Sequence, residues 1–216
     1  MDVGLVGLGL MGAAVTQRLL LAGHRVLGYD PAAAARAAHV ERGGEARDGL
    51  AEVAASVDVI VLSLPSGAVT LDVCLGEDGL VQHARKGALV VDTSTVHPDE
   101  AGAAAEGLRA VGIHFADAGV SGSSNNVAAG QALAVVGTEG DQFARAEQVL
   151  APFCTEVLHV GGVGAGMRAK LVINAVLSLH RAALAEGLVL AEKLGVDPAR
   201  MLDVLQRSLA SSKAMD

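Results

Sequence analysis

The sequence predicts an α/β protein in which a doubly wound, mostly parallel sheet is followed by an all-helical second domain. Short apolar runs rich in Val and Ile alternate with Ala-rich segments of helical period, as repeated βαβ units require. A glycine-rich turn joins the first predicted strand to the first predicted helix, and beyond residue 164 the pattern becomes helical. Because the strands of a parallel sheet are apolar on both faces, helices must cover both.

The first predicted domain spans residues 1–162 and follows this alternation in order. Strands are expected at Asp2–Val6, Arg25–Tyr29, Val57–Leu62, Leu89–Val91, His114–Ala116, Ala132–Val136 and Thr155–Val160. Helices are expected at Leu10–Ala22 and Ala32–Arg42, with crossover segments at Ser66–Leu75 and Pro98–Val111. The polar segment Gly119–Gly130 is predicted to be a structureless loop, and loops of this length inside a compact domain are usually functional.

The second predicted domain spans residues 163–216 and begins with a long helix at about Ala165–Leu194. Gly195 ends this helix, and Asp197 and Pro198 are typical of the cap and first residue of another. The apolar stripes of this region are wide enough to need cover, so a homodimer or homotetramer is expected.

Composition argues against several classes of function. A formal net charge of −8 and only four aromatic residues disfavour nucleic-acid binding. Cys74 and Cys154 are too few for a disulfide framework, and no His or Cys lies near either at metal-ligand spacing, so no metal is expected. The apolar runs stop well short of the roughly 18 residues that span a bilayer, and the first residues lack a signal-peptide pattern. A cytoplasmic protein without a membrane partner is expected.

The glycine-rich turn is the strongest local motif. It comprises Gly7, Leu8, Gly9, Leu10, Met11 and Gly12. In a dinucleotide-binding turn the first glycine permits the tight bend, the second lets the backbone approach a pyrophosphate, and the third lets the helix pack closely on the sheet. The N–H groups at the start of the helix then face the anion. A turn with a purely structural purpose is the alternative.

Asp30 stands at the end of the second predicted strand, where a dinucleotide fold places an acidic residue. Its carboxylate would accept hydrogen bonds from the ribose hydroxyls and repel a 2′-phosphate, and no Arg follows immediately. NAD is therefore favoured over NADP. An ordinary turn or cap residue is the alternative interpretation of Asp30.

Two more strand ends carry polar residues, and ligands of open α/β sheets bind beyond the carboxyl ends of the strands. The first of these strand ends is Leu64-Pro65-Ser66, and the second is Asp92-Thr93-Ser94-Thr95. Ser and Thr also cap helices routinely, so for Ser66 in particular a capping role is an equal alternative.

Lys170 and Asn174 are two polar residues in an apolar helical stretch. Because they are four residues apart, they share one helix face, which must meet water, a partner or a ligand. A lone Lys on a helix is usually a solvated surface charge, so the spacing by itself does not identify a catalyst.

Taken together, these motifs resemble the β-hydroxyacid dehydrogenases, a family that includes hydroxyisobutyrate dehydrogenase, tartronate semialdehyde reductase, and the glyoxylate and succinic semialdehyde reductases. The resemblance covers the whole chain in four ordered motifs. They are Gly7–Gly12, Asp92–Thr95, Asp117-Ala118-Gly119-Val120-Ser121-Gly122, and Gly164-x-Gly166-x-x-x-Lys170-x-x-x-Asn174.

The resemblance implies a Rossmann-like fold and an oxidoreductase that transfers a hydride between NAD(P) and a short β-hydroxy acid or its oxo or semialdehyde partner. It implies that Lys170 is the general acid/base and that Asn174 positions Lys170 or the substrate. It further implies that Ser121, Gly122 and Ser123 bind the substrate carboxylate and that Thr95 lies by the nicotinamide. Leu64, Pro65 and Ser66 are expected on the cofactor side.

The sequence departs from the family pattern mainly in the predicted substrate loop. Gly119 replaces the usual Pro, Ser123 replaces a common second Gly, and Asn125 and Asn126 stand in a stretch that is usually Gly- and Ala-rich. Family members also continue beyond the position of Asp216, so the helical domain is expected to be incomplete. Two alternatives stay open: an imine reductase-like enzyme, in which another residue usually replaces Lys170, and a cofactor-binding module without catalysis.

Overall fold

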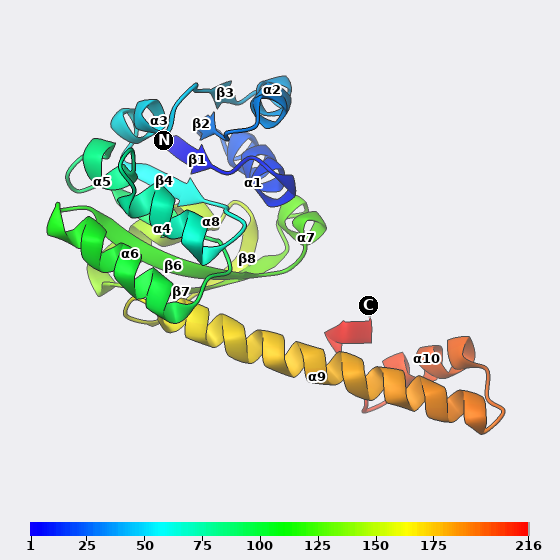
Figure 1. The fold of residues 1–216 in the computed structure, drawn as a ribbon. Coiled ribbons are helices and arrows are strands. Elements are labelled where there is room, and N and C mark those ends of the chain that lie inside the picture. Colours follow the sequence, from blue (N-terminus) through cyan, green and yellow to red (C-terminus); the bar gives the residue numbers. More distant parts are fainter. Residues whose placement is uncertain (216) are drawn as a thin grey trace. The chain divides into compact units, whose positions relative to one another are not determined.

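Eight strands form one sheet in the computed structural model, which describes residues 1–215 (Figure 1). The strand order is β3-β2-β1-β4-β5-β6-β7-β8. Strands β1 to β6 are parallel, β7 is antiparallel to β6, and β8 is parallel to β7. The strands are β1 Asp2–Val6, β2 Arg25–Tyr29, β3 Glu45–Ala46, β4 Val59–Leu62, β5 Leu89–Asp92, β6 His114–Ser121, β7 Ala132–Thr138 and β8 Cys154–Gly161.

Helices connect the strands and cover both faces of the sheet (Figure 1). The helices are α1 Leu10–Leu21, α2 Ala33–Glu41, α3 Leu50–Ser56, α4 Gly67–Leu75, α5 Leu80–His83, α6 Pro98–Ala110, α7 Ser124–Ala128, α8 Phe143–Leu150, α9 Ala165–Lys193 and α10 Pro198–Arg207, with short 3-10 turns at Gly140–Gln142 and Lys213–Met215. Residues of α1, α7 and α8 build the apolar core on one face. Residues of α3 to α6 and the first turn of α9 build the core on the other.

The central strands show why both faces are covered. All four residues of β4 and all four of β5 are buried, which is the pattern of strands with helices on either side. The prediction of a doubly wound, mostly parallel sheet followed by a helical region is therefore confirmed. The predicted strand at Val57–Leu62 begins only at Val59, because α3 extends to Ser56.

The predicted structureless loop at Gly119–Gly130 is wrong. Strand β6 continues to Ser121, because Gly119 and Ser121 pair with Val135 and Leu133 of β7. The short helix α7 follows, and its first turn is stabilised by a capping box between Ser123 and a residue three positions on. The shorter elements β3, α3, α5 and α8 were not predicted. Strand β3 and helix α5 are too short for a periodic signal, whereas α8 has buried apolar residues at helical spacing, Ala146, Val149 and Leu150.

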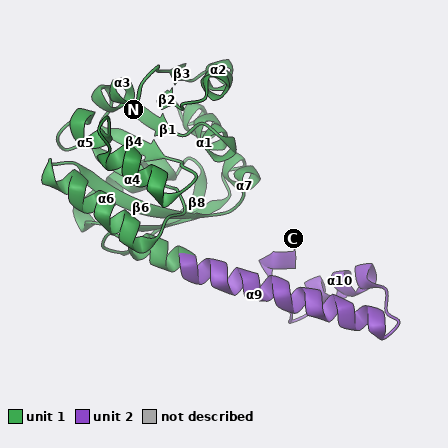
Figure 2. Ribbon diagram, in the orientation of Figure 1, with its two compact units in different colours: residues 1–170 green, residues 171–216 purple. Residues whose placement is uncertain are grey.

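The chain divides into two compact units, residues 1–170 and 171–216 (Figure 2). In the first unit the first turn of α9 packs against β6 and β7. In the second unit only Ala191 is buried among the described residues, and apolar side chains are exposed on both helices. By length and composition α9 could cross a membrane, since an 18-residue window has a mean hydropathy of 1.3.

Candidate active site

Gly7 and Gly12 have geometric roles within the turn that follows β1. Gly7 has a φ of 92°, and its N–H donates to the carbonyl oxygen of Tyr29. A Cβ on Gly7 would collide with the carbonyl oxygen of Ser63, and one on Gly12 would collide with that of Gly7. These two glycines are therefore required by the close packing of turn, helix and sheet.

Gly9 differs from its neighbours, because nothing in the fold requires a glycine there. Its φ is −65°, which any residue adopts, and a Cβ added to it would meet no atom within 4 Å. Gly9 does line a cavity of about 1100 Å³. An uncrowded glycine that faces a cavity at the start of a helix fits the close approach of a pyrophosphate.

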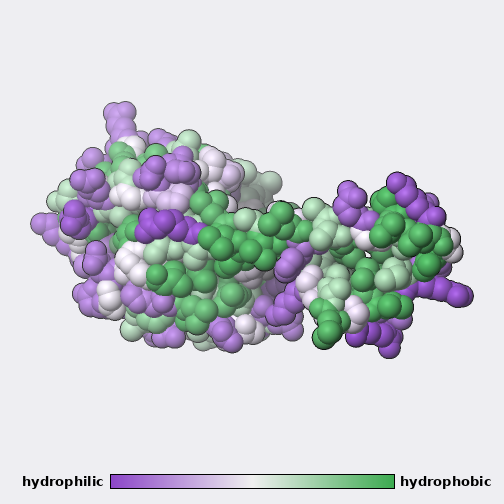
Figure 3. Space-filling model, turned by 90° about the horizontal axis from the view of Figure 1, so that it is seen from below, coloured by the Kyte–Doolittle hydropathy of each residue, from purple (hydrophilic) through white to green (hydrophobic). Residues whose placement is uncertain are grey.

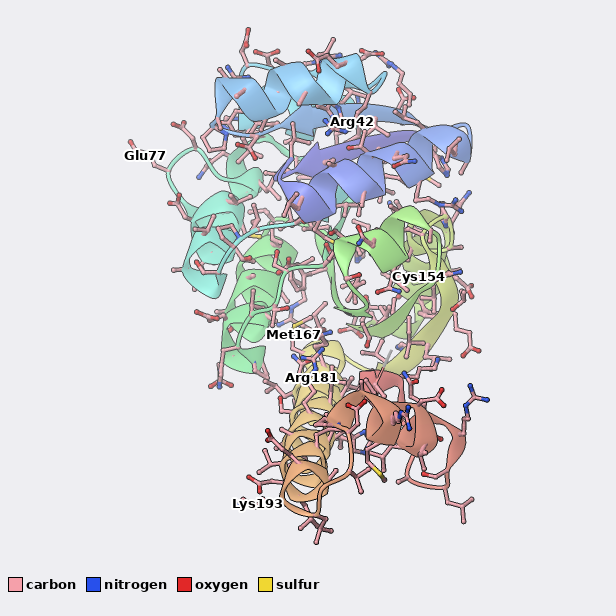
Figure 4. The ribbon with its side chains drawn as sticks, turned by 90° about the vertical axis from the view of Figure 1, so that its right-hand side faces the viewer. Arg42, Glu77, Cys154, Met167, Arg181 and Lys193 are labelled. Atoms are coloured by element: carbon pink, nitrogen blue, oxygen red, sulfur yellow. The ribbon has the colours of Figure 1, made fainter. Side chains whose placement is uncertain are left out.

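This cavity brings together much of the predicted cofactor site. Its lining includes Gly7, Gly9, Leu10, Met11, Asp30, Leu64 and Pro65. Leu8, Gly12, Ser66 and Thr95 were also predicted for the cofactor side, but they do not line the cavity. Four acidic residues are among its lining, Asp30, Asp72, Glu77 and Asp78. Figure 4 shows Glu77 on the loop after α4, and no Lys or Arg of the described chain lines the cavity.

Asp30 connects the end of β2 to the glycine turn. One carboxylate oxygen accepts from the backbone N–H of Leu8 at 2.9 Å, and the other accepts from that of Ala32 at 2.9 Å. Arg36 donates to the backbone oxygen of Asp30 at 2.8 Å. Asp30 thus has the structural contacts of a turn residue, and its carboxylate also lies at the cavity.

Ser94 and Asp92 join the loops after β4 and β5, a link that the sequence interpretation missed. Asp92 accepts from the backbone N–H of Ser94 at 2.9 Å, and the Ser94 hydroxyl accepts from that of Leu64 at 2.8 Å. Burial raises the pKa of Asp92 to about 6, against the effect of its hydrogen bonds to Ser94. An Asp followed two residues later by Ser is the signal that indicates such a turn.

Ser66 and Thr95 are the two predicted cofactor-side residues that follow β4 and β5 outside the cavity lining. Ser66 caps α4, with its hydroxyl accepting from the backbone N–H of Val69 at 3.4 Å, so the capping alternative describes its observed contact. Thr95 is exposed after β5. Its proximity to a nicotinamide stays a prediction.

The segment after β6 contains the predicted carboxylate-binding residues. Ser121 is half-buried at the end of β6, and Gly122 has a φ of 144°. The Ser123 hydroxyl accepts from the backbone N–H of Asn126 at 3.3 Å, and the Ser123 N–H donates to the Asn126 side chain at 2.8 Å. The helix cap therefore occupies the polar groups of Ser123, which leaves Ser121 and Gly122 better placed for a ligand.

Lys170 is half-buried, and its amine lies at the end of β6. Its Nζ donates to the carbonyl oxygen of Val120 at 2.6 Å, and burial lowers its pKa. The amine is thus directed to the strand end that precedes Ser121. Asn174 belongs to the second unit, one turn further along α9, and its role stays a prediction.

The topology places the glycine turn and the lysine at one edge of the sheet. Strands β1, β4, β5 and β6 are parallel neighbours, so their carboxyl ends lie on the same edge. The glycine turn follows β1, Leu64 and Thr95 follow β4 and β5, and Val120 with its bound amine lies near the end of β6. This is the edge at which open α/β sheets bind ligands.

Two family models match the chain. One is described as the NAD binding domain of 6-phosphogluconate dehydrogenase and matches residues 2–161. The other is described as NAD-binding of NADP-dependent 3-hydroxyisobutyrate dehydrogenase and matches residues 164–216. Together they cover both the sheet and the helical region.

Individual relatives agree with the family models. The chain is 35% identical to 3-hydroxyisobutyrate dehydrogenase of Pseudomonas aeruginosa, covering 100% of this chain and 72% of the relative. It is 35% identical to 2-(hydroxymethyl)glutarate dehydrogenase of Eubacterium barkeri, covering 99% and 71%.

Solved structures show the same relationship. The structure of Mycobacterium tuberculosis 3-hydroxyisobutyrate dehydrogenase with L-serine superposes with a TM-score of 0.90 at 33% identity, over 99% of this chain and 72% of that one. A Streptomyces aurantiacus imine reductase, at 19% identity and a TM-score of 0.86 over 96% and 72% of the two chains, shares the fold alone. The chain therefore belongs to the β-hydroxyacid dehydrogenase family and is an NAD(P)-dependent oxidoreductase that acts on the CH–OH group of hydroxy acids.

Proposed function

We propose that Lys170 is the general acid/base of this dehydrogenase and that NAD is its preferred dinucleotide. The observation that carries the first part is the contact between the Lys170 amine and the Val120 carbonyl oxygen. It directs the amine to the sheet edge where the glycine turn also lies. Lys193 on the same helix is exposed, whereas Lys170 is half-buried.

The chemistry of a buried amine suits the reaction. The dinucleotide, when bound, gives or accepts the hydride. The oxygen on the reacting carbon must gain or lose a proton, which the Lys170 ammonium can give during carbonyl reduction and the neutral amine can take during alcohol oxidation. Burial lowers the pKa of Lys170 from its ordinary value, because it disfavours the charged form of the amine.

The carboxylate of the substrate is assigned to the segment between β6 and α7. The Ser121 hydroxyl and the backbone N–H of Gly122 are the donors assigned to it, since the Ser121 backbone pairs with Leu133 in the sheet and Ser123 forms the helix cap. A carboxylate held there would place the neighbouring carbons of a short acid beside the Lys170 amine. Asn174 is assigned to orienting the amine or the substrate.

Replacement of Lys170 tests the mechanism. Lys170→Ala should lower kcat by about 10²–10⁴-fold while leaving the cofactor affinity unchanged. Lys193→Ala, which removes an exposed lysine from the same helix, should behave as wild type. Turnover on a panel of short hydroxy acids and semialdehydes, with cofactor titration by fluorescence, measures both quantities. Near-normal turnover by Lys170→Ala would refute the assignment.

The preference for NAD rests on the charge of the cavity. Asp30, Asp72, Glu77 and Asp78 give it a negative lining, which disfavours the added charge of a 2′-phosphate. Arg36 is the competing feature, since its guanidinium lies close by. That group is already bonded to backbone oxygens of Asp30 and Pro31.

Asp30→Asn tests the preference. Removing this charge should shift the ratio of kcat/KM for NAD to that for NADP by about tenfold toward NADP. Asp99→Asn neutralises an exposed carboxylate outside the cavity lining and away from Arg36, and should leave the ratio unchanged. A wild-type enzyme that already favours NADP would contradict the proposal.

A homodimer or homotetramer formed through the second unit is also proposed. Exposed apolar side chains are distributed along α9 and α10, and hydrophobic surface is visible over this unit in Figure 3. Among them are Leu171, Val172, Val176, Leu179, Leu190 and Val204. Light scattering after size exclusion should show an oligomer. Leu179→Glu should weaken this oligomer, whereas Leu21→Glu, which changes an exposed residue of the first unit, should not. A wild-type monomer would contradict this.

A further inference from the structure

We propose that Asp117 is a positioning residue for Lys170, acting by fixing the first turn of α9 onto β6. The inference rests on the proposed role of Lys170, and it assigns to Asp117 a task in the reaction without contact to substrate or cofactor. All the residues that carry it belong to the first unit.

The Asp117 carboxylate binds the start of α9 with both of its oxygens. Asp117 is fully buried on β6. One oxygen accepts from the backbone N–H of Gly164 at 2.6 Å, and the other accepts from that of Met167 at 2.7 Å. Figure 4 labels Met167 at this end of the helix. The two bonds satisfy N–H groups that have no partner within the helix.

The local sequence offers α9 no cap of its own. The residue before the helix is Gly164, which has a φ of 84° and no side chain that could accept from the first turn. Helices usually begin at a Ser, Thr, Asp or Asn that performs this function. Here a carboxylate from a distant strand replaces it, and its charge complements the positive end of the helix. The position of the helix start therefore depends on Asp117.

Glycines bring α9 against the sheet at backbone distance. A Cβ on Gly119 would lie 2.8 Å from the Cβ of Lys170, and one on Gly166 would lie 2.7 Å from the carbonyl oxygen of Val135. Such contacts leave the first turn little freedom to move sideways. Asp117 then determines how far along β6 the turn sits.

The two contacts between β6 and α9 have matched spacing. Asp117 binds Met167 and Val120 binds Lys170, so both pairs are 50 residues apart in sequence. The Lys170 side chain runs from its Cβ, which lies beside Gly119, to the Val120 carbonyl oxygen. A shift of the helix start would therefore be transmitted to the amine.

Asp117→Asn in two backgrounds tests this role. In the wild-type background it should lower kcat by about 10–100-fold, because a small displacement of an acid–base group is that costly. Cofactor affinity should be unchanged. In the Lys170→Ala background it should lower residual kcat no further, because its effect passes through the missing amine. Asp117→Glu, which keeps the carboxylate, should recover part of the loss.

A second readout follows the amine itself and needs no turnover. The chain has four lysines, Lys86, Lys170, Lys193 and Lys213, so labelling by an amine reagent can be assigned by peptide mass spectrometry. In Asp117→Asn, Lys170 should label faster, with the other three as internal controls. Thr138→Val removes another buried hydrogen bond, to the Phe115 carbonyl oxygen, and should change neither labelling nor kcat.

The outcomes separate the two proposals. Equal loss of kcat in both backgrounds, or unchanged labelling of Lys170, would overturn the positioning role and reduce Asp117 to a structural residue. Full turnover by Lys170→Ala alone would instead overturn the proposed mechanism. Loss of turnover in Lys170→Ala with normal kcat in Asp117→Asn would leave the mechanism intact and refute only the inference.

Discussion

The glycine turn comes from one continuous stretch of chain, Gly7–Gly12, whereas the surroundings of Lys170 are assembled from two stretches that lie 50 residues apart. The turn is shaped by backbone conformation and by contacts with adjacent strand ends. The lysine is placed by hydrogen bonds between β6 and α9. Changes to the turn should therefore affect folding and cofactor binding, while changes near the lysine should affect turnover.

The largest expected effect comes from Gly7→Ala. The new Cβ would be strained by the φ of 92° and would also collide with the Ser63 carbonyl oxygen. The two costs together should lower the free energy of unfolding by about 2–4 kcal/mol and abolish cofactor binding. Denaturant unfolding and cofactor titration measure the two quantities.

Gly23→Ala is the matched control for this change. Gly23 has a φ of 80°, but a Cβ there would meet nothing within 4 Å. It should cost only the backbone strain of about 1 kcal/mol. If Gly7→Ala and Gly23→Ala lower the free energy of unfolding equally, the crowding at Gly7 does not contribute to stability. The turn would then be less constrained than its geometry indicates.

Gly119→Ala, near Lys170, should lower turnover and spare cofactor binding, in contrast to Gly7→Ala. A Cβ 2.8 Å from that of Lys170 forces the first turn of α9 away from β6. We expect kcat to fall by about 10–100-fold with cofactor affinity retained. Gly4→Ala introduces equal crowding, 2.8 Å from the Val53 side chain, and should lower stability without changing kcat. Steady-state kinetics at saturating cofactor measures this, and a loss confined to cofactor affinity would contradict it.

The contrast between local motifs and contacts between distant segments also explains which parts of the fold the sequence could predict. The sheet and its main helices follow from periodicity, because patterns of 2.0 and 3.6 residues are local. The short helix α7 depends on the capping box of Ser123 and Asn126. Ser123 was interpreted as a carboxylate-binding residue, and Asn126 only as a departure from a family pattern. Its four-residue signal is too short for periodicity to detect.

The candidate site likewise contains residues that a local motif predicts and residues whose contacts depend on the packing of distant segments. Gly7–Gly12 and Asp30 were predictable as a local motif with a partner at fixed spacing. Lys170 could be singled out only through the resemblance, since a lysine on a helix carries no local sign of its surroundings. The contacts of Asp117 with Gly164 and Met167 were not predictable at all, because they depend on how α9 packs on β6.

Gly9→Ala should weaken cofactor binding with little effect on folding. The added methyl group meets no protein atom but enters the space that a pyrophosphate would occupy. We expect about tenfold weaker affinity, or about 1.4 kcal/mol, with unchanged thermal stability. Gly102→Ala adds a methyl to another uncrowded glycine, outside this cavity, and should leave affinity unchanged. Unaltered affinity in Gly9→Ala would mean that the dinucleotide does not approach this turn.

The smallest effect is expected from Asp92→Asn. This change removes the buried carboxylate that is connected to the Leu64 backbone through Ser94. Burial raises the pKa of Asp92 from 3.8 to about 6. A group with a raised carboxyl pKa contributes stability that is fully present below 3.8 and lost as pH rises through about 6. Asn does not titrate and can still accept from Ser94, so near pH 7 the variant should be more stable than wild type by about 1 kcal/mol. Near pH 4 this gain should vanish. Thermal melts at both pH values measure the stability difference between Asp92→Asn and wild type, with the exposed change Asp99→Asn as control. If Asp92→Asn is instead destabilised most at pH 7, the ionised carboxylate is required there.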